Sequence, residues 1–171
     1  MMRRFPPALF AAVLAAGLAP TAPAMAQDQS AEPAPAADPG PPPNGDPGAT
    51  PIAGDAVYKA FHEKAGIDRI GADTVDRSAA DPRISDIFKN RDLPHLKEML
   101  SVQLCYILGG PCTYAGKDMK TAHKDMGVRV ADFNALVENL QKAMDREGVP
   151  FRMQNRLLAK LAPQQRVVVQ R

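Results

Sequence analysis

Apolar residues between positions 52 and 171 recur at the three- and four-residue spacing of α-helices. This spacing predicts short helices at 55–64 and 67–80, separated by a break at Ala65-Gly66, and a helical turn at 84–88 that Asp81 caps. No segment alternates apolar and polar residues for long enough to indicate a β-strand. The pattern therefore predicts an all-α domain.

The most regular apolar stripe runs from Leu93 to Leu108 and predicts a helix more clearly than any earlier segment does. Gly109-Gly110-Pro111 ends it, because glycine accepts left-handed backbone and proline cannot continue a helix. A short helix at 118–124 follows. Helices this short and this often interrupted pack poorly alone, so a buried cofactor would supply the missing core. The remaining predicted boundaries are a cap at Asp132, a stop at Gly148, a start at Pro150 and a kink at Pro163.

Residues 1–26 have the features of a secretory signal peptide. Arg3 and Arg4 give a positive start, residues 8–19 form an apolar run, and residues 24–26 give a small-x-small cleavage site. The apolar run is too short to cross a bilayer permanently. We therefore expect cleavage after Ala26, a periplasmic or secreted product, and no stable membrane insertion once the signal is removed.

The segment 27–51 contains eight prolines and almost no large apolar side chain. Such a composition cannot offset the entropy of ordering, so this segment is predicted to be a disordered linker before a single domain at 52–171. Without residues 1–26 the chain has 19 basic and 19 acidic residues. This balance gives no reason to expect a nucleic-acid partner.

The sequence carries few of the motifs that mark common enzymes. Its three histidines, His62, His95 and His123, do not have the spacing of a zinc site. Motifs of hydrolytic and nucleotide-using enzymes are absent, and so is the C-x-x-C-H motif that attaches haem covalently. Cys105 and Cys112 lie on either side of the Gly-Gly-Pro corner. They could form a disulfide or remain a buried thiol and a loop thiol; the sequence leaves both open.

Several motifs, in order along the chain, resemble group I truncated haemoglobins. The most specific is the arrangement Gly-Gly-Pro at 109–111, Tyr-x-Gly at 114–116 and Met-Lys-x-x-His at 119–123. The resemblance covers nearly all of residues 57–169. It implies a two-over-two helical sandwich around haem b. Further matches are Leu96-Lys97, Asp132-Phe133 and Gly148-Val149-Pro150.

By this resemblance, His123 is the proximal ligand of the haem iron. Phe88 corresponds to the ring that wedges the haem, and Tyr114 to a partner of a haem propionate. The distal side is expected to carry Leu96, Met99 and Leu100. The proximal and edge packing is expected from Met119, Val128, Phe133 and Leu136.

The distal positions depart from the family. Group I proteins commonly have Phe-Tyr where this chain has Thr74-Val75, and often have glutamine where it has Leu96 and Leu100. An apolar pocket offers few hydrogen-bond donors, so dioxygen should dissociate faster and oxidise the iron more readily. The expected function is reversible binding of a diatomic gas, O2, NO or CO. Weak NO dioxygenase or peroxidase activity is left open.

Two other functions follow from the same residues. The thioether of Met99 could be a sixth iron ligand, which would give a His/Met electron-transfer protein with a redox partner. His95, beside the distal face, could also reach the iron or a propionate. The other alternative is a helical binding module that kept the globin scaffold without haem.

Overall fold

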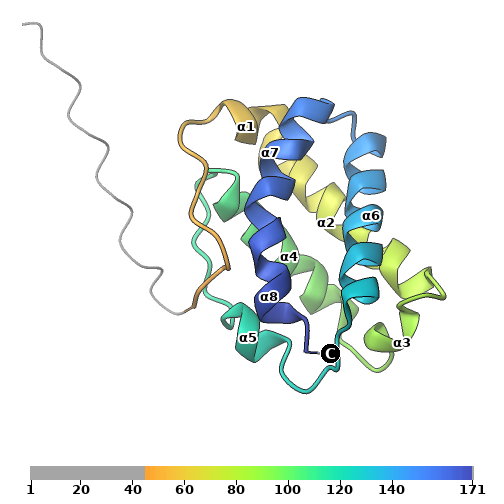
Figure 1. Cartoon of the computed structure of the whole chain (residues 1–171). Helices are drawn as coiled ribbons and strands as arrows, with labels where there is room; N and C mark the ends of the chain where they lie inside the picture. Colours follow the sequence, from red (N-terminus) through yellow and green to blue (C-terminus); the bar gives the residue numbers. More distant parts are fainter. Residues whose placement is uncertain (1–44, 171) are drawn as a thin grey trace, which may run out of the picture. The chain divides into compact units, whose positions relative to one another are not determined.

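The computed structural model describes residues 45–170, and their regular secondary structure is entirely helical (Figure 1). The predicted all-α class is therefore confirmed. The predicted signal peptide and residues 27–44 lie outside the described residues. No helix within 45–170 has the length and apolar composition needed to span a bilayer. The helices are α1 Ala56–Ala60, α2 Glu63–Ala80, α3 Ser85–Phe88, α4 Leu93–Ile107, α5 Met119–Ala122, α6 Val130–Arg146, α7 Phe151–Leu161 and α8 Gln165–Val168, with a 3₁₀ turn η1 at Ala162–Gln164.

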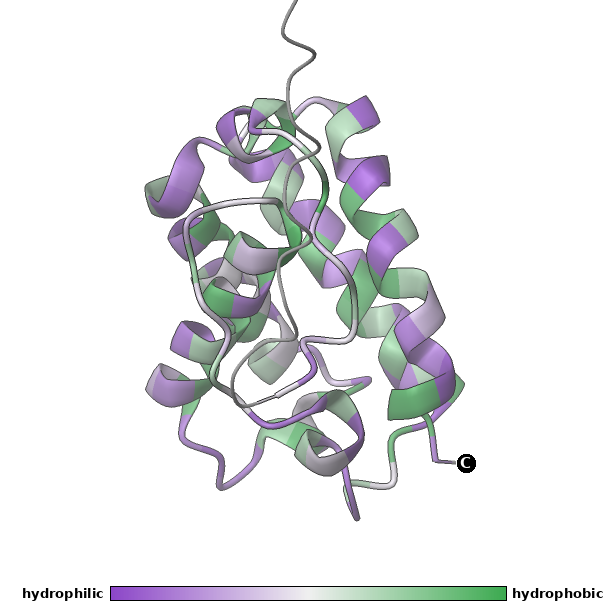
Figure 2. Cartoon of the chain, turned by 90° about the vertical axis from the view of Figure 1, so that its left-hand side faces the viewer, coloured by the Kyte–Doolittle hydropathy of each residue, from purple (hydrophilic) through white to green (hydrophobic). Residues whose placement is uncertain are grey.

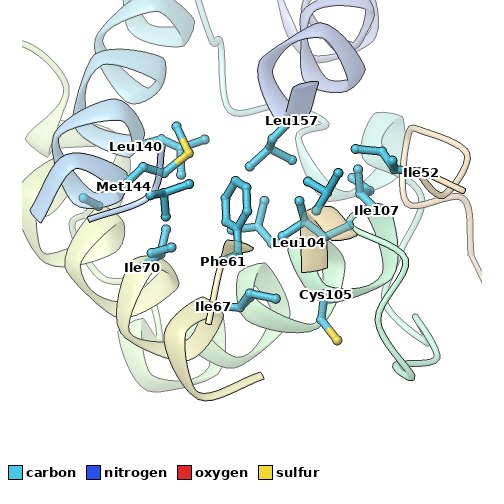
Figure 3. Close-up of a cluster of buried hydrophobic side chains, with 14 residues drawn as sticks. Ile52, Phe61, Ile67, Ile70, Leu104, Cys105, Ile107, Leu140, Met144 and Leu157 are labelled. Carbon is cyan, nitrogen blue, oxygen red and sulfur yellow. The ribbon is translucent and has the colours of Figure 1, made fainter. Parts of the chain in front are cut away.

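The core lies between α2, α4, α6 and α7. Figure 3 shows Phe61 in the middle of this cluster, with side chains from α2 and α6 to one side and from α4 to the other. In Figure 2 the helices carry apolar and polar residues next to each other along their length, as amphipathic helices do. The fully buried members include Phe61, Ile67, Ile70, Leu104, Ile107, Met144 and Leu157.

The predicted break at Ala65-Gly66 was wrong, because α2 runs through both residues. Both α2 glycines serve close packing instead. A Cβ on Gly66 would overlap the carbonyl of Phe61, and a Cβ on Gly71 would overlap the hydroxyl of Ser101 in α4. Glycine at these positions therefore lets the turn after α1 and the helix α4 approach α2.

Two capping predictions also differ from the structure. Helix α6 begins three residues earlier than predicted, and Asp132 lies inside its first turn, where its carboxylate accepts a hydrogen bond from the Arg129 backbone at 2.9 Å. Asp81 follows α2 and accepts from the backbone N–H of Arg83 at 3.0 Å, which turns the chain toward α3. The predicted ends at Gly148, Pro150 and Pro163 are confirmed.

Part of the predicted linker packs onto the domain. Pro47 is buried, and its carbonyl accepts a hydrogen bond from Nε2 of Gln103 at 2.7 Å. The backbone N–H of Ile52 donates to the carbonyl of Ile107 at 2.8 Å. Residues 45–51 are therefore attached to the end of α4, which the composition of this segment did not indicate.

Cys105 and Cys112 form a disulfide, with 5.8 Å between their Cα atoms. The sequence had left this pairing open. The bond joins the last turn of α4 to the segment after Gly109-Gly110-Pro111, so it closes the corner that leads to α5. Cys105 is fully buried.

Polar side chains link α2 and the residue before it to the end of α6. Arg146 and Asp73 pair at 3.1 Å, while Glu147 receives hydrogen bonds from Arg69 and from His62. The hydrogen bond from Arg69 is the largest cause that lowers the pKa of Glu147, to about 2. Burial opposes this shift, and the hydrogen bond from His62 adds to it. These pairs fix the orientation of α6 against α2.

Replacing Glu147 with glutamine should lower the free energy of unfolding at pH 7 by about 1 kcal/mol, a modest value because Arg69 is exposed. A carboxylate with a lowered pKa stabilises the fold above its unfolded pKa and loses this contribution as the pH falls. The difference between the two proteins should therefore shrink between about pH 5 and pH 2. Urea unfolding at several pH values measures it. Glu138→Gln, at a half-exposed partner of Arg83, is the matched control; an equal effect in both variants would contradict the prediction.

Replacing both Cys105 and Cys112 with serine should lower the free energy of unfolding by about 2 kcal/mol, because the bond restricts the unfolded chain. Urea unfolding measures the change. A reducing agent should shift the midpoint of the natural chain toward that of the variant and leave the variant unchanged. Equal midpoints for the natural chain and the variant without a reducing agent would show that the disulfide does not stabilise the fold.

Candidate functional site

The candidate site is organised around α5, a helix of one turn between Met119 and Ala122. Asp118 caps it, accepting from the backbone N–H of Thr121 at 2.9 Å. Hydrogen bonds from Thr121 lower the pKa of Asp118 below its usual value. A single turn is not stable in isolation, so contacts with other segments must hold α5 in place.

His123 follows α5 directly and is half-buried. Its Nδ1 lies 2.8 Å from the carbonyl oxygen of Met119. A carbonyl only accepts hydrogen bonds, so Nδ1 carries the proton and Nε2 keeps a free lone pair. This is the arrangement in which protein imidazoles bind metals, with the second nitrogen fixed by a backbone carbonyl.

Most of the predicted proximal and edge residues come together around α5, whereas Leu136 does not. Tyr114, Met119 and Val128 are buried in one small cluster, and Phe133 packs against it. Val168 of α8 completes this cluster. Met119, whose carbonyl binds Nδ1 of His123, is part of this cluster. The cluster therefore links His123 to the predicted edge residues.

The other predicted contact residues are apolar but only partly covered. Leu96 and Met99 of α4, Phe88 of α3 and Leu136 of α6 are half-buried and belong to neither hydrophobic cluster. Leu100 differs, because it packs against the main core. Apolar surface left uncovered on three helices suits an apolar ligand.

A cavity of about 250 Å³ lies between α6, α7 and the turns that follow. Phe133 is the one predicted site residue in its wall. The wall is mainly apolar, with two amide side chains. The residues that line it are Phe133, Asn134, Val137, Leu158, Leu161, Ala162 and Gln165.

Two of the four positions that depart from the family on the expected distal side are buried. Thr74 and Val75 are each 1% exposed, and Oγ1 of Thr74 donates to the carbonyl of Ile70 at 2.7 Å. The hydroxyl proton of Thr74 is therefore used within α2. His95 lies exposed in the first turn of α4, where its backbone N–H donates to Asp92 at 3.0 Å.

Tyr114 has a hydroxyl that donates to the carbonyl of Lys117 at 2.7 Å. Burial raises the pKa of this hydroxyl. The hydrogen bond from Tyr114 to Lys117 stabilises the segment before α5. Gly116 lies so close to the ring of Tyr114 that a Cβ at this position would overlap it. The role of Tyr114 as a propionate partner stays a prediction.

Two glutamines that the sequence did not single out contact the site. Gln103 of α4 is buried, and its Nε2 lies 3.1 Å from the sulfur of Met119 as well as bonding Pro47. Gln170 donates from Nε2 to the carbonyl of His123 at 2.7 Å. A glutamine inside an apolar stripe was the available signal for Gln103, since buried amides need partners. The sequence held no comparable signal for Gln170.

Residues 56–169 match the family model described as bacterial-like globin. The chain belongs to the bacterial-like globin family. The group 1 truncated haemoglobin of Tetrahymena pyriformis is 40% identical over 70 residues, which are 41% of this chain and 58% of that protein. The corresponding LI410 protein of Chlamydomonas moewusii is 36% identical over 76 residues, which are 43% of this chain and 44% of that protein. These alignments thus span about half the length of the curated relatives.

Solved structures match over a longer range. The truncated haemoglobin of Tetrahymena pyriformis in the Fe(III) form has a TM-score of 0.64 and 26% identity, covering 67% of this chain and 98% of that chain. The 2/2 haemoglobin of Synechococcus has a TM-score of 0.63 and 22% identity with the same coverage, and so supports the fold alone. The expected group I truncated globin and its fold are confirmed.

Haem is the cofactor of this family, and haem-based gas binding is its general function. The residues present fit this group. His123 has a free Nε2, which is the one protein ligand that haem iron needs. The half-covered apolar side chains on α3, α4 and α6 suit the faces and edge of a flat apolar ring. Within residues 45–170 no group of three or more His, Cys, Asp or Glu side chains could hold a bare metal ion.

Replacing His123 with glycine should weaken haem binding by more than about 100-fold, because even the outer partners of a metal ligand contribute 10- to 100-fold. Free imidazole should restore the spectrum by occupying the space left. Absorbance titration with haemin measures both effects, and His95→Gly, at the exposed histidine of α4, is the matched control. Unchanged haem affinity in His123→Gly would show that His123 is not the ligand.

Proposed function

We propose that this chain is an exported truncated haemoglobin that holds haem b through Nε2 of His123 and reversibly binds O2, NO or CO. The observation that carries the proposal is the 2.8 Å hydrogen bond between Nδ1 of His123 and the carbonyl of Met119. It fixes both the tautomer and the direction of the ring. A histidine on a helical surface has no need of such a constraint.

When bound, haem supplies an iron with a coordination position open to a gas. The residues of this chain orient and polarise the imidazole and exclude water. The carbonyl of Met119 polarises the imidazole and makes Nε2 a stronger donor. Leu96, Met99 and Phe88 present apolar surface that excludes water from the space beside the gas.

An apolar distal pocket is supported by the positions that surround it. Solved variants of the Tetrahymena pyriformis protein replace a tyrosine, a glutamine 21 positions later and a second glutamine four positions after that. Val75, Leu96 and Leu100 have the same spacing in this chain. Thr74, beside them, has its hydroxyl proton bonded to Ile70. Bound dioxygen, which carries partial negative charge, should gain little from such a pocket, whereas bound CO and NO should lose little.

Export is supported by two independent features. The signal-like residues 1–26 come from the sequence, and the disulfide between Cys105 and Cys112 comes from the structure. Disulfides persist in oxidising compartments such as the periplasm and are rare in the cytosol. A periplasmic or secreted location is therefore part of the proposal.

A second candidate function is electron transfer through a His/Met haem site with a redox partner. The observation in its favour is Met99, which is half-buried on α4 and packs against neither hydrophobic cluster. A flexible thioether with uncovered surface can reach a sixth coordination position.

Absorption spectra of the haem-loaded chain separate these functions. Gas binding predicts a five-coordinate reduced spectrum that changes on addition of CO. Electron transfer predicts a six-coordinate reduced spectrum that Met99→Ala converts to five-coordinate. A chain that takes up no haem and shows no Soret band would overturn both proposals and favour a haem-free binding module.

Replacing Val75 with tyrosine should slow dioxygen release by about fivefold, because one added hydrogen bond contributes roughly 1 kcal/mol. Stopped-flow displacement of dioxygen by CO measures the release rate. Val75→Phe is the matched control, since it fills the same buried space without a hydroxyl. Equal release rates for the two variants would show that this position does not reach the gas.

A further inference from the structure

We infer that Gln170, near the end of the chain, is a positioning residue for His123. The inference rests on the proposed function of His123. Nε2 of Gln170 donates to the carbonyl of His123 at 2.7 Å, and its Oε1 accepts from the backbone N–H of Gly127 at 3.0 Å. The backbone N–H of Gln170 also donates to the carbonyl of Val128 at 2.8 Å.

Among the described residues 45–170, α5, Met126 and Gln170 supply hydrogen-bond partners for every polar group of His123 except Nε2. The backbone N–H and Nδ1 of His123 both lie within hydrogen-bond distance of the Met119 carbonyl, at 3.2 and 2.8 Å. The carbonyl of His123 accepts from Met126 at 3.3 Å and, more closely, from Gln170. Within the described residues, Nε2, the nitrogen that would bind iron, is the one polar group of His123 that these hydrogen bonds do not involve.

The segment after His123 is irregular and depends on contacts from elsewhere. Asp125 and Gly127 both have positive φ, at 61° and 64°. For aspartate this conformation is uncommon and persists where the surroundings favour it. Gln170 spans this turn, with one amide atom on His123 at its start and the other on Gly127 at its end.

The fold brings Gln170 to this place through α8. Figure 1 shows α8 next to α5, and the two helices are in contact. Val168 of α8 is buried in the cluster that contains Met119 and Val128, and Val169 is extended. This packing places Gln170 beside the turn that follows His123.

Gln170 itself is exposed, so it contributes no core packing. Its loss should leave the helices intact and loosen only the direction in which His123 points. The axial imidazole transmits such a change to the iron, where the vibration of the iron–histidine bond reports it.

The experiment compares Gln170→Leu with the matched control Gln141→Leu, a half-buried glutamine of α6, in the full chain loaded with haem. Resonance Raman spectra of the reduced protein give the frequency of the iron–histidine stretch, and transfer to excess apomyoglobin gives the rate of haem loss. We expect Gln170→Leu to shift and broaden the band and to release haem about tenfold faster. Gln141→Leu should match the natural chain.

A second variant tests which contact of the Gln170 side chain, with His123 or with Gly127, positions the imidazole. Gln170→Glu keeps an acceptor for Gly127 but places a carboxylate oxygen against the carbonyl of His123. We expect it to behave like Gln170→Leu. If Gln170→Glu matches the natural chain, the contact with Gly127 suffices and positioning through the His123 carbonyl is overturned.

The remaining outcomes separate this inference from the proposed function. No Soret band in the natural chain overturns the proposed function, and the inference with it. Haem bound through His123, together with an unchanged band and rate in Gln170→Leu, overturns the inference alone. A lower thermal midpoint with an unchanged band also overturns it, since Gln170 would then have a structural role only.

Discussion

The site depends on one hydrogen bond, from Nδ1 of His123 to the carbonyl of Met119. It exists because α5 is a single turn that ends where the histidine begins, so the ring folds back on the carbonyl four residues earlier. A single turn cannot hold this geometry unaided. Gln103 of α4 contacts Met119, Asp118 caps the turn, and Gln170 bonds the carbonyl of His123.

The two hydrophobic clusters have different tasks. The larger one joins α2, α4, α6 and α7 into a frame, which the polar pairs between α2 and α6 keep in register. The smaller one surrounds α5 and includes Val168 of α8. Leu96, Met99 and Leu136 belong to neither cluster and are left partly uncovered. A fold that closed over these side chains would have a fuller core but no room for a prosthetic group.

Sequence patterns predicted the parts of the fold that depend on local chemistry. Helix ends at Gly148 and Pro163 follow from backbone geometry, and His123 was found through a motif. Gly66 was misread as a break because close packing against Phe61 outweighs its low helix propensity. Gln103 and Gln170 were missed because the groups they bond, at Pro47 and His123, are far away in the sequence.

The hydrogen bonds around the site are distributed unevenly. Amides and carbonyls fix His123, whereas the hydroxyl of Thr74, at a position expected on the distal side, is bonded within its own helix. Under the proposed function, the gas meets few donors, so its retention depends mainly on the iron and its histidine. The direction of the imidazole then becomes the main property that this chain can adjust. A residue at the end of the chain can therefore affect gas binding without touching the gas.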